Sequence, residues 1–289
     1  MNFEQFERYL DKNRNLVNRY LERYLYPPTK FPPVIHRAMR YSLLAGGKRV
    51  RPLLAIAAYE TCGGHNHKII PAACALEMMH TFSLIHDDLP CMDNDDLRRG
   101  KPTCHIKFGE ANAVLAGDAL CILSFELLGS VGDDRVVREL AHALGTCGMI
   151  GGQVVDVASE GQKVSKKTLH YIHAHKTGAL IASSIKIGAM ISGVRATRIK
   201  VIQEYGDLLG MAFQIVDDLL DVLGDPKIIG KPAKRDAERG KNTYPGLYGE
   251  EKSKKMALEY AKKAKAIIKS FDQYGLLGYM ADYFVNRIS

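Results

Sequence analysis

Apolar residues recur along this chain at the three- and four-residue spacing of amphipathic helices. The first stripe consists of Phe3, Phe6, Leu10, Val17, Tyr20, Leu21 and Tyr24. Pro27 and Pro28 then end the segment, because proline interrupts a helix. A second helix is predicted from Pro32–Pro33, where proline favours a helix start, to Gly46–Gly47, where glycine favours an end. Alternating β-branched runs bounded by turns are missing, so the pattern predicts an all-α protein.

The same periodicity predicts further helices through the rest of the chain. They cover residues 50–61, 71–89, 109–130, 134–149, 166–174, 177–193, 196–224, 250–270 and 275–286. Two irregular polar stretches, 90–107 and 224–249, are predicted to be loops. Both loops adjoin acidic motifs.

Several predicted helices are apolar on most of their circumference. Examples are Ala72–Ile85, Ala111–Leu128 and Ala179–Ile191. Helices of this kind lie in the middle of a bundle, surrounded by other helices. No composition shift, linker or fixed repeat divides the chain. Residues 1–289 are therefore predicted to form one domain, a single large helical bundle.

The composition fits a globular protein with a sizeable core. Of the 289 residues, 46% are hydrophobic, which is more than disordered chains contain. No run of about 18 uninterrupted apolar residues occurs, and the best candidate, Ile181–Val194, contains Lys186, so we expect no membrane span. The N-terminal residues Met1–Arg8 include acids, unlike a secretion signal or a transit peptide, and favour a cytoplasmic location.

Cysteine spacing gives no sign of a metal or redox motif. The six cysteines form no Cys-x-x-Cys pair and occupy positions Cys62, Cys74, Cys91, Cys104, Cys121 and Cys147. A chain of this length does not need disulfides for stability, so reduced and mostly buried thiols are expected.

The net charge of +8 comes from one stretch of the chain. Residues 226–269 contain 13 Lys and Arg against 5 Asp and Glu, a surplus equal to the whole net charge. The stretch lacks the interleaved aromatic side chains on which nucleic acid bases stack, so no nucleic acid partner is expected. Its later lysines are predicted to form a solvated helix face: Lys252, Lys254, Lys255, Lys262, Lys263 and Lys265.

The strongest chemical signal is an acidic motif at the end of an apolar helix. Asp87 and Asp88 precede Pro90, which breaks or kinks the helix, and Asp93 follows shortly after. Such close carboxylates repel one another unless cations bind there. Carboxylates without His or Cys suit Mg²⁺, which keeps water ligands and shares its coordination with substrate phosphates.

A second acidic motif lies inside a predicted helix. Asp217 and Asp221 are four residues apart and share a face, and Asp218 is three residues from Asp221. Like charges at this spacing weaken a helix, so a buried or structural role is unattractive. The two motifs together predict one cleft rimmed by acids that hold several Mg²⁺ ions.

Basic residues accompany both acidic motifs and indicate a phosphorylated ligand. The Gly46–Pro52 segment offers flexible backbone amides with Lys and Arg at a helix start. Arg98 and Arg99 follow the first motif, Lys176 and Thr177 begin an apolar helix, and Lys231 and Lys241 follow the second motif. The chain contains no phosphate loop, no Gly-x-Ser-x-Gly and no nucleophile with a partnered base. A reaction whose leaving group is diphosphate needs none of these.

At these residues the chain resembles the short-chain trans-isoprenyl diphosphate synthases, most closely the bacterial farnesyl diphosphate synthases. The resemblance extends over most of the chain in ordered motifs. They are Gly46–Pro52, His80, Asp87–Thr103, Gly151-Gly152-Gln153 with Asp156, His175–Gly178, Phe213-Gln214, Asp217–Asp221, and Gly240-Lys241 with Thr243-Tyr244-Pro245.

The resemblance implies an all-α isoprenoid synthase fold around a deep central cavity, in a homodimer. It implies head-to-tail condensation of isopentenyl diphosphate with dimethylallyl and then geranyl diphosphate to give farnesyl diphosphate. The alternative within the family is a geranylgeranyl or geranyl diphosphate synthase.

Residue roles carried over from the family centre on Mg²⁺ and two diphosphates. Asp87 and Asp93 would bind two Mg²⁺ ions and Asp217 a third, while Asp88, Asp218 and Asp221 would act mainly through water or neighbouring groups. The allylic diphosphate would contact Arg98, Lys176, Gln214, Lys231 and Lys241. Thr177 would face the developing cation. Isopentenyl diphosphate would contact Lys48, Arg51, His80 and Arg99.

Product length is predicted from the turn before the first acidic motif. A chain growing along this helix would meet Phe82 and Ser83, which lie five and four residues before Asp87. In the family, an aromatic residue there together with the inserted Pro90-Cys91 resembles enzymes that stop at fifteen carbons. Plain core packing of Phe82 is the alternative.

Three alternatives to this function remain: a di-iron carboxylate protein, a class I terpene cyclase and a non-catalytic partner subunit. Glu77-x-x-His80 and Glu139-x-x-His142 match a di-iron carboxylate pattern, but that interpretation leaves both Asp motifs unexplained. A class I terpene cyclase would not use the basic isopentenyl site, and a non-catalytic partner subunit tends to lose an Asp motif. Other histidines are predicted to lie in a solvated loop or on a helix surface: His65, His67, His170, His173 and His175.

Overall fold

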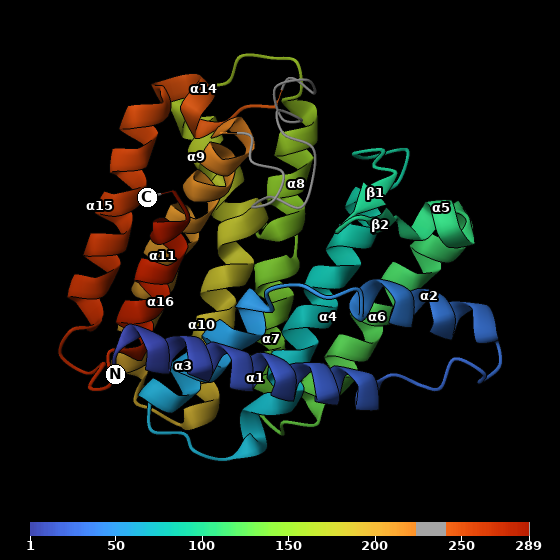
Figure 1. The fold of residues 1–289 in the computed structure, drawn as a ribbon, viewed down its shortest axis with the longest axis horizontal. Coiled ribbons are helices and arrows are strands. Elements are labelled where there is room, and N and C mark those ends of the chain that lie inside the picture. Colours follow the sequence, from blue (N-terminus) through green and yellow to red (C-terminus); the bar gives the residue numbers. More distant parts are fainter. Residues whose placement is uncertain (224–240, 289) are drawn as a thin grey trace.

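The computed structural model describes residues 1–223 and 241–288, so that Lys231 lies outside the described residues. Helices dominate the described chain (Figure 1). The first half contains α1 Phe3–Tyr24, α2 Pro33–Leu43, α3 Val50–Thr61, α4 Ile70–Asp87, α5 Cys104–Phe108, α6 Glu110–Gly129 and α7 Asp134–Leu144. The second half contains α8 Met149–Ala158, α9 Lys166–Ile172, α10 Ala179–Ser192, α11 Ala196–Leu223, α14 Tyr244–Tyr248, α15 Glu250–Ile268 and α16 Leu276–Val285.

Short elements complete the fold. A π-helical segment, His173–Gly178, joins α9 to α10, and 3₁₀ turns occupy His67–Ile69 and Asn286–Ile288. A two-stranded antiparallel hairpin pairs β1 Leu97–Arg98 with β2 Lys101–Pro102. The all-α prediction is confirmed.

Local sequence explains where several helices begin. Asn2 accepts a hydrogen bond from the Gln5 amide, while the Gln5 side chain accepts one from the Asn2 amide, which caps α1 at both groups. Pro33 occupies the first turn of α2, where its missing N–H costs nothing. These start signals lie within a few residues of each helix and are therefore readable from the sequence.

The helices pack into one bundle around two adjoining hydrophobic clusters. Helices α4, α6, α10, α11 and α15 run upright in Figure 1, whereas α1 lies across them near one end. One cluster forms around α4 and α6, and the other around α3, α10, α11 and α15. The β1–β2 hairpin and α14 lie toward the end opposite α1 (Figure 1).

Two glycines let α11 pack directly on the preceding segment. A Cβ at Gly206 would lie 2.8 Å from the Cα of Ala182, and a Cβ at Gly210 would lie 2.8 Å from the Cα of Gly178. Close packing of small residues therefore brings α11, which carries the second acidic motif, against the segment that carries Lys176.

The predicted loops and one helix boundary are wrong in part. Stretch 90–107 contains the hairpin, closed at Arg99 and Gly100 with φ of 54° and 73°, and the start of α5. Stretch 224–249 contains α14. Elements this short carry no readable periodicity. The helix predicted to reach residue 149 ends at Leu144, and α8 was not predicted because its glycine-rich start has low helix propensity that packing overrides.

Two helices are long and apolar enough to meet a length-and-hydropathy criterion for a membrane span, among the residues that the structure describes. The first is the continuous stretch His67–Asp87, formed by a 3₁₀ turn and α4, in which 67% of the most apolar 18 residues are buried, as in a core helix. The second is α6, Glu110–Gly129, in which 44% of the corresponding residues are buried. On α6, Leu115 and Ile122 remain 55% and 68% exposed. The described chain therefore leaves an apolar face of α6 uncovered.

The prediction for the burial of the cysteines and the prediction for the exposure of the α15 lysines had different outcomes. All six cysteines are free thiols; three are buried and Cys121 is half-buried, whereas Cys91 and Cys147 are exposed, so the prediction of mostly buried thiols is confirmed only in part. The lysines on α15 lie opposite its buried alanines and are exposed, apart from the half-buried Lys254, which confirms a solvated face.

Candidate active site

One cavity of about 720 Å³ collects nearly all the predicted site residues. Among the described residues with a predicted role in the site, Lys48 and Asp88 are not in its lining. The predicted residues that line the cavity are Arg51, His80, Phe82, Ser83, Asp87, Asp93, Arg98, Arg99, Lys176, Thr177, Gln214, Asp217 and Lys241. Both acidic motifs and the basic residues therefore share one site, as the sequence predicts.

The first acidic motif folds back on the end of α4. The amide of Asp93 donates to the carbonyl of Asp87 at 2.8 Å, and the amide of Asp95 donates to the carbonyl of Asp88 at 3.1 Å. This turn brings the Asp93 carboxylate near Asp87. Burial raises the pKa of Asp87, and the charge of Asp93 raises it further, while Lys176 lowers it. An added cation would stabilise both carboxylates.

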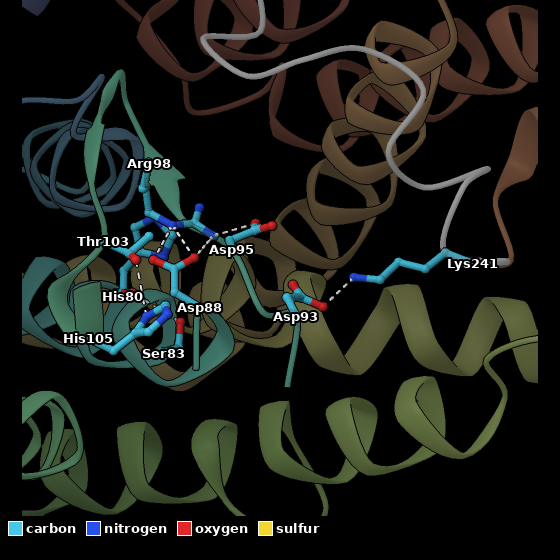
Figure 2. Close-up of polar contacts among 9 residues, drawn as sticks. All are labelled: His80, Ser83, Asp88, Asp93, Asp95, Arg98, Thr103, His105 and Lys241. Atoms are coloured by element: carbon cyan, nitrogen blue, oxygen red, sulfur yellow. Dashed lines mark hydrogen bonds and ion pairs between the residues drawn. The ribbon is translucent and has the colours of Figure 1, made fainter. Parts of the chain in front are cut away.

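Asp88, which is not part of the cavity lining, holds the side chain of Arg98. The buried Asp88 carboxylate accepts hydrogen bonds from Nε and Nη2 of Arg98 at 2.7 and 2.5 Å, and Asp95 lies 3.8 Å from the same guanidinium (Figure 2). A bidentate pair of this kind fixes the plane of the guanidinium. Asp88 therefore fixes the orientation of Arg98, and its indirect role in the reaction stays a prediction.

Basic side chains reach two of the predicted metal ligands. Lys241 Nζ lies 2.8 Å from Asp93 Oδ1 (Figure 2), and Arg287 Nη2 lies 3.5 Å from Asp217 Oδ1. No group of three or more His, Cys, Asp or Glu within the described ranges is arranged to hold a metal by itself. Separate carboxylates facing a large cavity fit Mg²⁺, because this ion keeps waters and takes substrate phosphates as ligands.

The prediction that a buried role is unattractive for the second acidic motif is wrong for Asp218. Its side chain is 3% exposed and lies 2.8 Å from His173 Nε2. His173 is itself 4% exposed, so the prediction of a helix-surface histidine is also wrong. The cost of a like-charge helix pair is a few tenths of a kcal/mol, which one buried charged hydrogen bond exceeds.

Arg51 is a buried cation in the cavity lining with a hydrogen-bond donor that no described residue uses. It is 8% exposed, and its buried Nε has no hydrogen-bond partner within the described residues. Burial lowers the pKa of Arg51 to about 10, so the group stays charged at neutral pH. Burial and the nearby Arg51 charge lower the pKa of His80 well below its ordinary value, so His80 is neutral. An anion entering here meets a charged donor and a neutral imidazole.

Arg49, by contrast, is structural. Its Nη1 donates to buried Glu77 at 2.7 Å, and its other nitrogens bond Asn18 and the carbonyl of Leu43. Glu139 forms a 2.5 Å ion pair with Lys186 on the neighbouring helix. Both glutamates of the di-iron pattern are thus engaged by cations, which argues against that alternative.

Lys176 is positioned by the π-helical segment. Its Nζ lies 2.5 Å from Asp156 of α8. A Cβ at Gly152 would lie 2.2 Å from the backbone nitrogen of Lys176, so only glycine allows α8 to approach this closely. A π-helical turn widens the backbone and is common at functional sites. Its position next to α8 explains why Gly152 and Asp156 accompany Lys176 and Thr177 in the sequence.

The predicted chain-length residues lie on the cavity side of α4. The ring of half-buried Phe82 packs edge-on against His86, with centroids 5.0 Å apart. Ser83 Oγ donates to the carbonyl of His80 at 3.0 Å, which turns the hydroxyl back to its own helix. Phe82 is therefore the larger obstacle along this wall.

Sequence reasoning missed Arg287. This side chain lines the cavity, approaches Asp217, and lies over the ring of Phe213 at 5.8 Å. Burial lowers the pKa of Lys48, and the charge of Arg287 lowers it further, which places Lys48 near this cation. A single arginine close to the C-terminus belongs to no motif, so no sequence signal could have identified it.

We expect the His173→Asn substitution to destabilise the protein most at acidic pH. Burial lowers the pKa of His173, but the charge and hydrogen bond of Asp218 outweigh this and raise it above the ordinary value of about 6.5. A raised folded-state pKa gives stability that is fully present below the unfolded pKa and is lost as pH rises through the folded pKa. Melting curves of both proteins from acidic to alkaline pH test this, and a Tm difference that stays constant would contradict it.

Comparisons with known proteins agree with this geometry. The family model described as polyprenyl synthetase matches residues 32–273. The large subunit 1 of heterodimeric geranylgeranyl pyrophosphate synthase from Arabidopsis thaliana is 50% identical over 92% of this chain and 75% of its own. Geranylgeranyl pyrophosphate synthases from Capsicum annuum and Catharanthus roseus are 46% and 47% identical.

Solved structures share the fold over nearly the whole chain. An FPP/GFPP synthase from Zymomonas mobilis has a TM-score of 0.85 and 34% identity, covering 97% of this chain and 99% of its own. A geranyltransferase from Helicobacter pylori, complexed with magnesium and isoprenyl diphosphate, has a TM-score of 0.84 and 31% identity, covering 99% and 98%.

Proposed function

The chain belongs to the polyprenyl synthetase family and is a prenyltransferase, and from this premise we propose that it makes geranylgeranyl diphosphate. It would condense isopentenyl diphosphate with allylic diphosphates until the product has twenty carbons. The observation that carries this proposal is the set of relatives, 46–50% identical, that are named geranylgeranyl synthases. They favour this product over the farnesyl diphosphate that the sequence predicts.

The cavity supplies what the reaction needs. When bound, Mg²⁺ would neutralise the charge of the leaving diphosphate, as in this Mg²⁺-dependent family. We propose that Asp87, Asp93 and Asp217 hold three such ions. Arg98 and Lys176 would stabilise the same diphosphate through charged hydrogen bonds, as preorganised donors do in an enclosed site.

Carbon–carbon bond formation then follows from alignment. The allylic C–O bond breaks with its electron pair leaving on diphosphate, and the double bond of isopentenyl diphosphate attacks the allylic cation. A proton leaves the new chain, with the released diphosphate as its acceptor. Holding both diphosphates at fixed positions supplies the alignment, and the apolar walls at Phe82 and Met149 exclude water that would quench the cation.

Farnesyl diphosphate is the second candidate product. Phe82 lines the cavity one turn before Asp87, where a bulky ring shortens the space for a growing chain. Incubation of the purified protein with Mg²⁺, labelled isopentenyl diphosphate and C5, C10 or C15 primers distinguishes the two. A C20 product, also from the C15 primer, supports the proposal, whereas products that stop at C15 support the second candidate.

We expect Arg287→Gln to weaken binding of isopentenyl diphosphate. Its guanidinium lies near Asp217 and Lys48, and its buried Nε has no hydrogen-bond partner in the described part of the chain. Losing one charged hydrogen bond to a diphosphate should raise the KM for isopentenyl diphosphate about tenfold. Steady-state kinetics with each substrate varied in turn measure this effect, and an unchanged KM would show that Arg287 does not contact this substrate.

The uncovered apolar face of α6 supports a homodimer. Leu115 and Ile122 are more than half exposed on a helix that is otherwise apolar, and patches of this kind commonly mark interfaces. We propose a second copy of this chain as the occupant. Light scattering on the wild type should give a dimer mass, and Ile122→Lys should give a monomer. A wild-type monomer would contradict the proposal.

A further inference from the structure

One buried carboxylate connects three separate parts of the site. Asp218 Oδ2 accepts a hydrogen bond from the amide of Tyr244 at 2.9 Å and lies 2.8 Å from His173 Nε2. Its other oxygen accepts from Gln214 Nε2 at 2.8 Å. Tyr244 is 2% exposed, so the contact is shielded from water. Asp218 therefore ties α11 both to the π-helical segment and to the start of α14.

His173 is held between two acceptors. Its Nδ1 lies 3.1 Å from the carbonyl of Leu169, and its Nε2 faces the Asp218 carboxylate. Because neither partner can donate, both hydrogen bonds require both ring nitrogens to carry protons. The ring also packs edge-on against Tyr244 at 5.1 Å. The result is a buried, charge-assisted pair with little freedom to move.

The segment Lys241–Tyr244 spans the distance between the two acidic motifs. Lys241 Nζ bonds Asp93 of the first motif, and Tyr244 bonds Asp218 of the second. Between them, the side-chain nitrogen Nδ2 of Asn242 donates to the backbone carbonyls of Ser159 and Gln162, each at 3.1 Å. Three residues of extended chain reach only about 10 Å, so fixing Tyr244 limits where the Lys241 backbone can lie.

We propose that Asp218, paired with His173, is a positioning residue that anchors the Lys241–Tyr244 segment so that Lys241 reaches the first acidic motif. Asp218 acts through this anchor, and its neighbour Asp217 faces the substrate. Both carboxylate oxygens of Asp218 are already bonded to protein donors. The proposal rests on the prenyl transfer reaction and is independent of the product's length.

A double-mutant cycle with Lys241 tests the anchor. In the wild type, Lys241→Met should lower kcat/KM for the allylic diphosphate by about 30-fold, the scale of losing one charged hydrogen bond. Asp218→Asn and His173→Asn should each lower the same kcat/KM by up to about 30-fold, because misplacing the segment removes at most what Lys241 contributes. In either variant, adding Lys241→Met should cost less than about threefold, since residues that act as a unit are not additive.

Two further variants separate positioning from general destabilisation. His173→Gln places its amide nitrogen close to the position of His173 Nε2 and so keeps a donor for Asp218, whereas the shorter Asn side chain does not reach; Gln should therefore restore most of the activity that His173→Asn loses. His170→Asn removes an exposed histidine from α9, three residues before His173. Its Nδ1 lies 3.5 Å from the Tyr244 hydroxyl and takes no part in the hydrogen bonds of Asp218 described above. This substitution should leave kcat/KM within about twofold of the wild type.

The Mg²⁺ dependence decides between an anchor and a metal ligand. The anchor predicts that Asp218→Asn leaves the Mg²⁺ concentration for half-maximal rate unchanged. A large increase in that concentration, with the full Lys241→Met effect retained, would overturn the proposal, as would wild-type kcat/KM in His173→Asn. If Asp218→Asn fails to fold, the His173 pair of variants carries the test. Each comparison uses the primer that the wild type accepts, so a different product length does not affect the result.

Discussion

Alanine in place of Asp87 or Asp217 is expected to abolish condensation while the protein stays folded. Both side chains line the cavity, one from the end of α4 and the other from α11. Each is a proposed ligand for an ion that stabilises the leaving diphosphate. Removing one such electrostatic contact from an enclosed site should lower the rate at least about 1,000-fold. Incorporation of labelled isopentenyl diphosphate into extractable product measures the loss.

Folding should survive because neither carboxylate supports the core. Burial raises the pKa of Asp87, so the native state gains nothing from its charge, and the side chain of Asp217 is 52% exposed. Asp96→Ala is the matched control: Asp96 belongs to the same acidic stretch but is exposed and outside the cavity lining. Full activity in Asp87→Ala or Asp217→Ala would refute the Mg²⁺ assignment, and equal loss in Asp96→Ala would refute its specificity.

Phe82→Ala is expected to lengthen the product by at least one five-carbon unit. The Phe82 ring borders the cavity beside His86, about one helical turn from Asp87. An allylic chain whose diphosphate is held at Asp87 extends along this wall as it grows. Replacing the ring by a methyl group opens space that the next isoprene unit can occupy. The expectation holds whether the wild type stops at C15 or at C20.

Chromatographic sizing of the products checks this prediction, with Phe213→Ala as the aromatic control. Phe213 also lines the cavity, but it lies on α11, beside Arg287 and packed edge-on against Phe284. Its removal should change substrate affinity and leave product length unchanged. An unaltered distribution in Phe82→Ala would mean that Phe82 is a packing residue and that the limit to growth lies elsewhere.

The cavity shows how far local sequence reasoning extends. Asp87, Asp217 and Lys176 belong to short motifs whose residue types and spacing already indicate diphosphate chemistry, and all three line the cavity. Helix α1 likewise follows from a stripe of apolar residues and a capping box. Such features are encoded within a few residues, so no knowledge of distant partners is needed.

Pairings between distant residues could not be predicted in this way. Arg49 and Arg51 stand two positions apart in one motif, yet Arg49 bonds Glu77 in the core while Arg51 faces the cavity. Asp217 and Asp218 are neighbours and both line the cavity, but successive helix positions point about 100° apart, so Asp217 is 52% exposed whereas Asp218 is buried against His173. The partner that each charge meets depends on how the helices pack.

The sequence by itself determined the helical class of this protein, its two acidic motifs and the chemistry that they serve, because periodicity and motif spacing are local properties. Tertiary structure alone decided which carboxylates face the cavity and which hold the fold together. It also places Arg287 beside Asp217 of the second acidic motif, 70 residues earlier in the chain. Burial and distance set these roles, since a charge removed from water must find its partner wherever the packed helices place one.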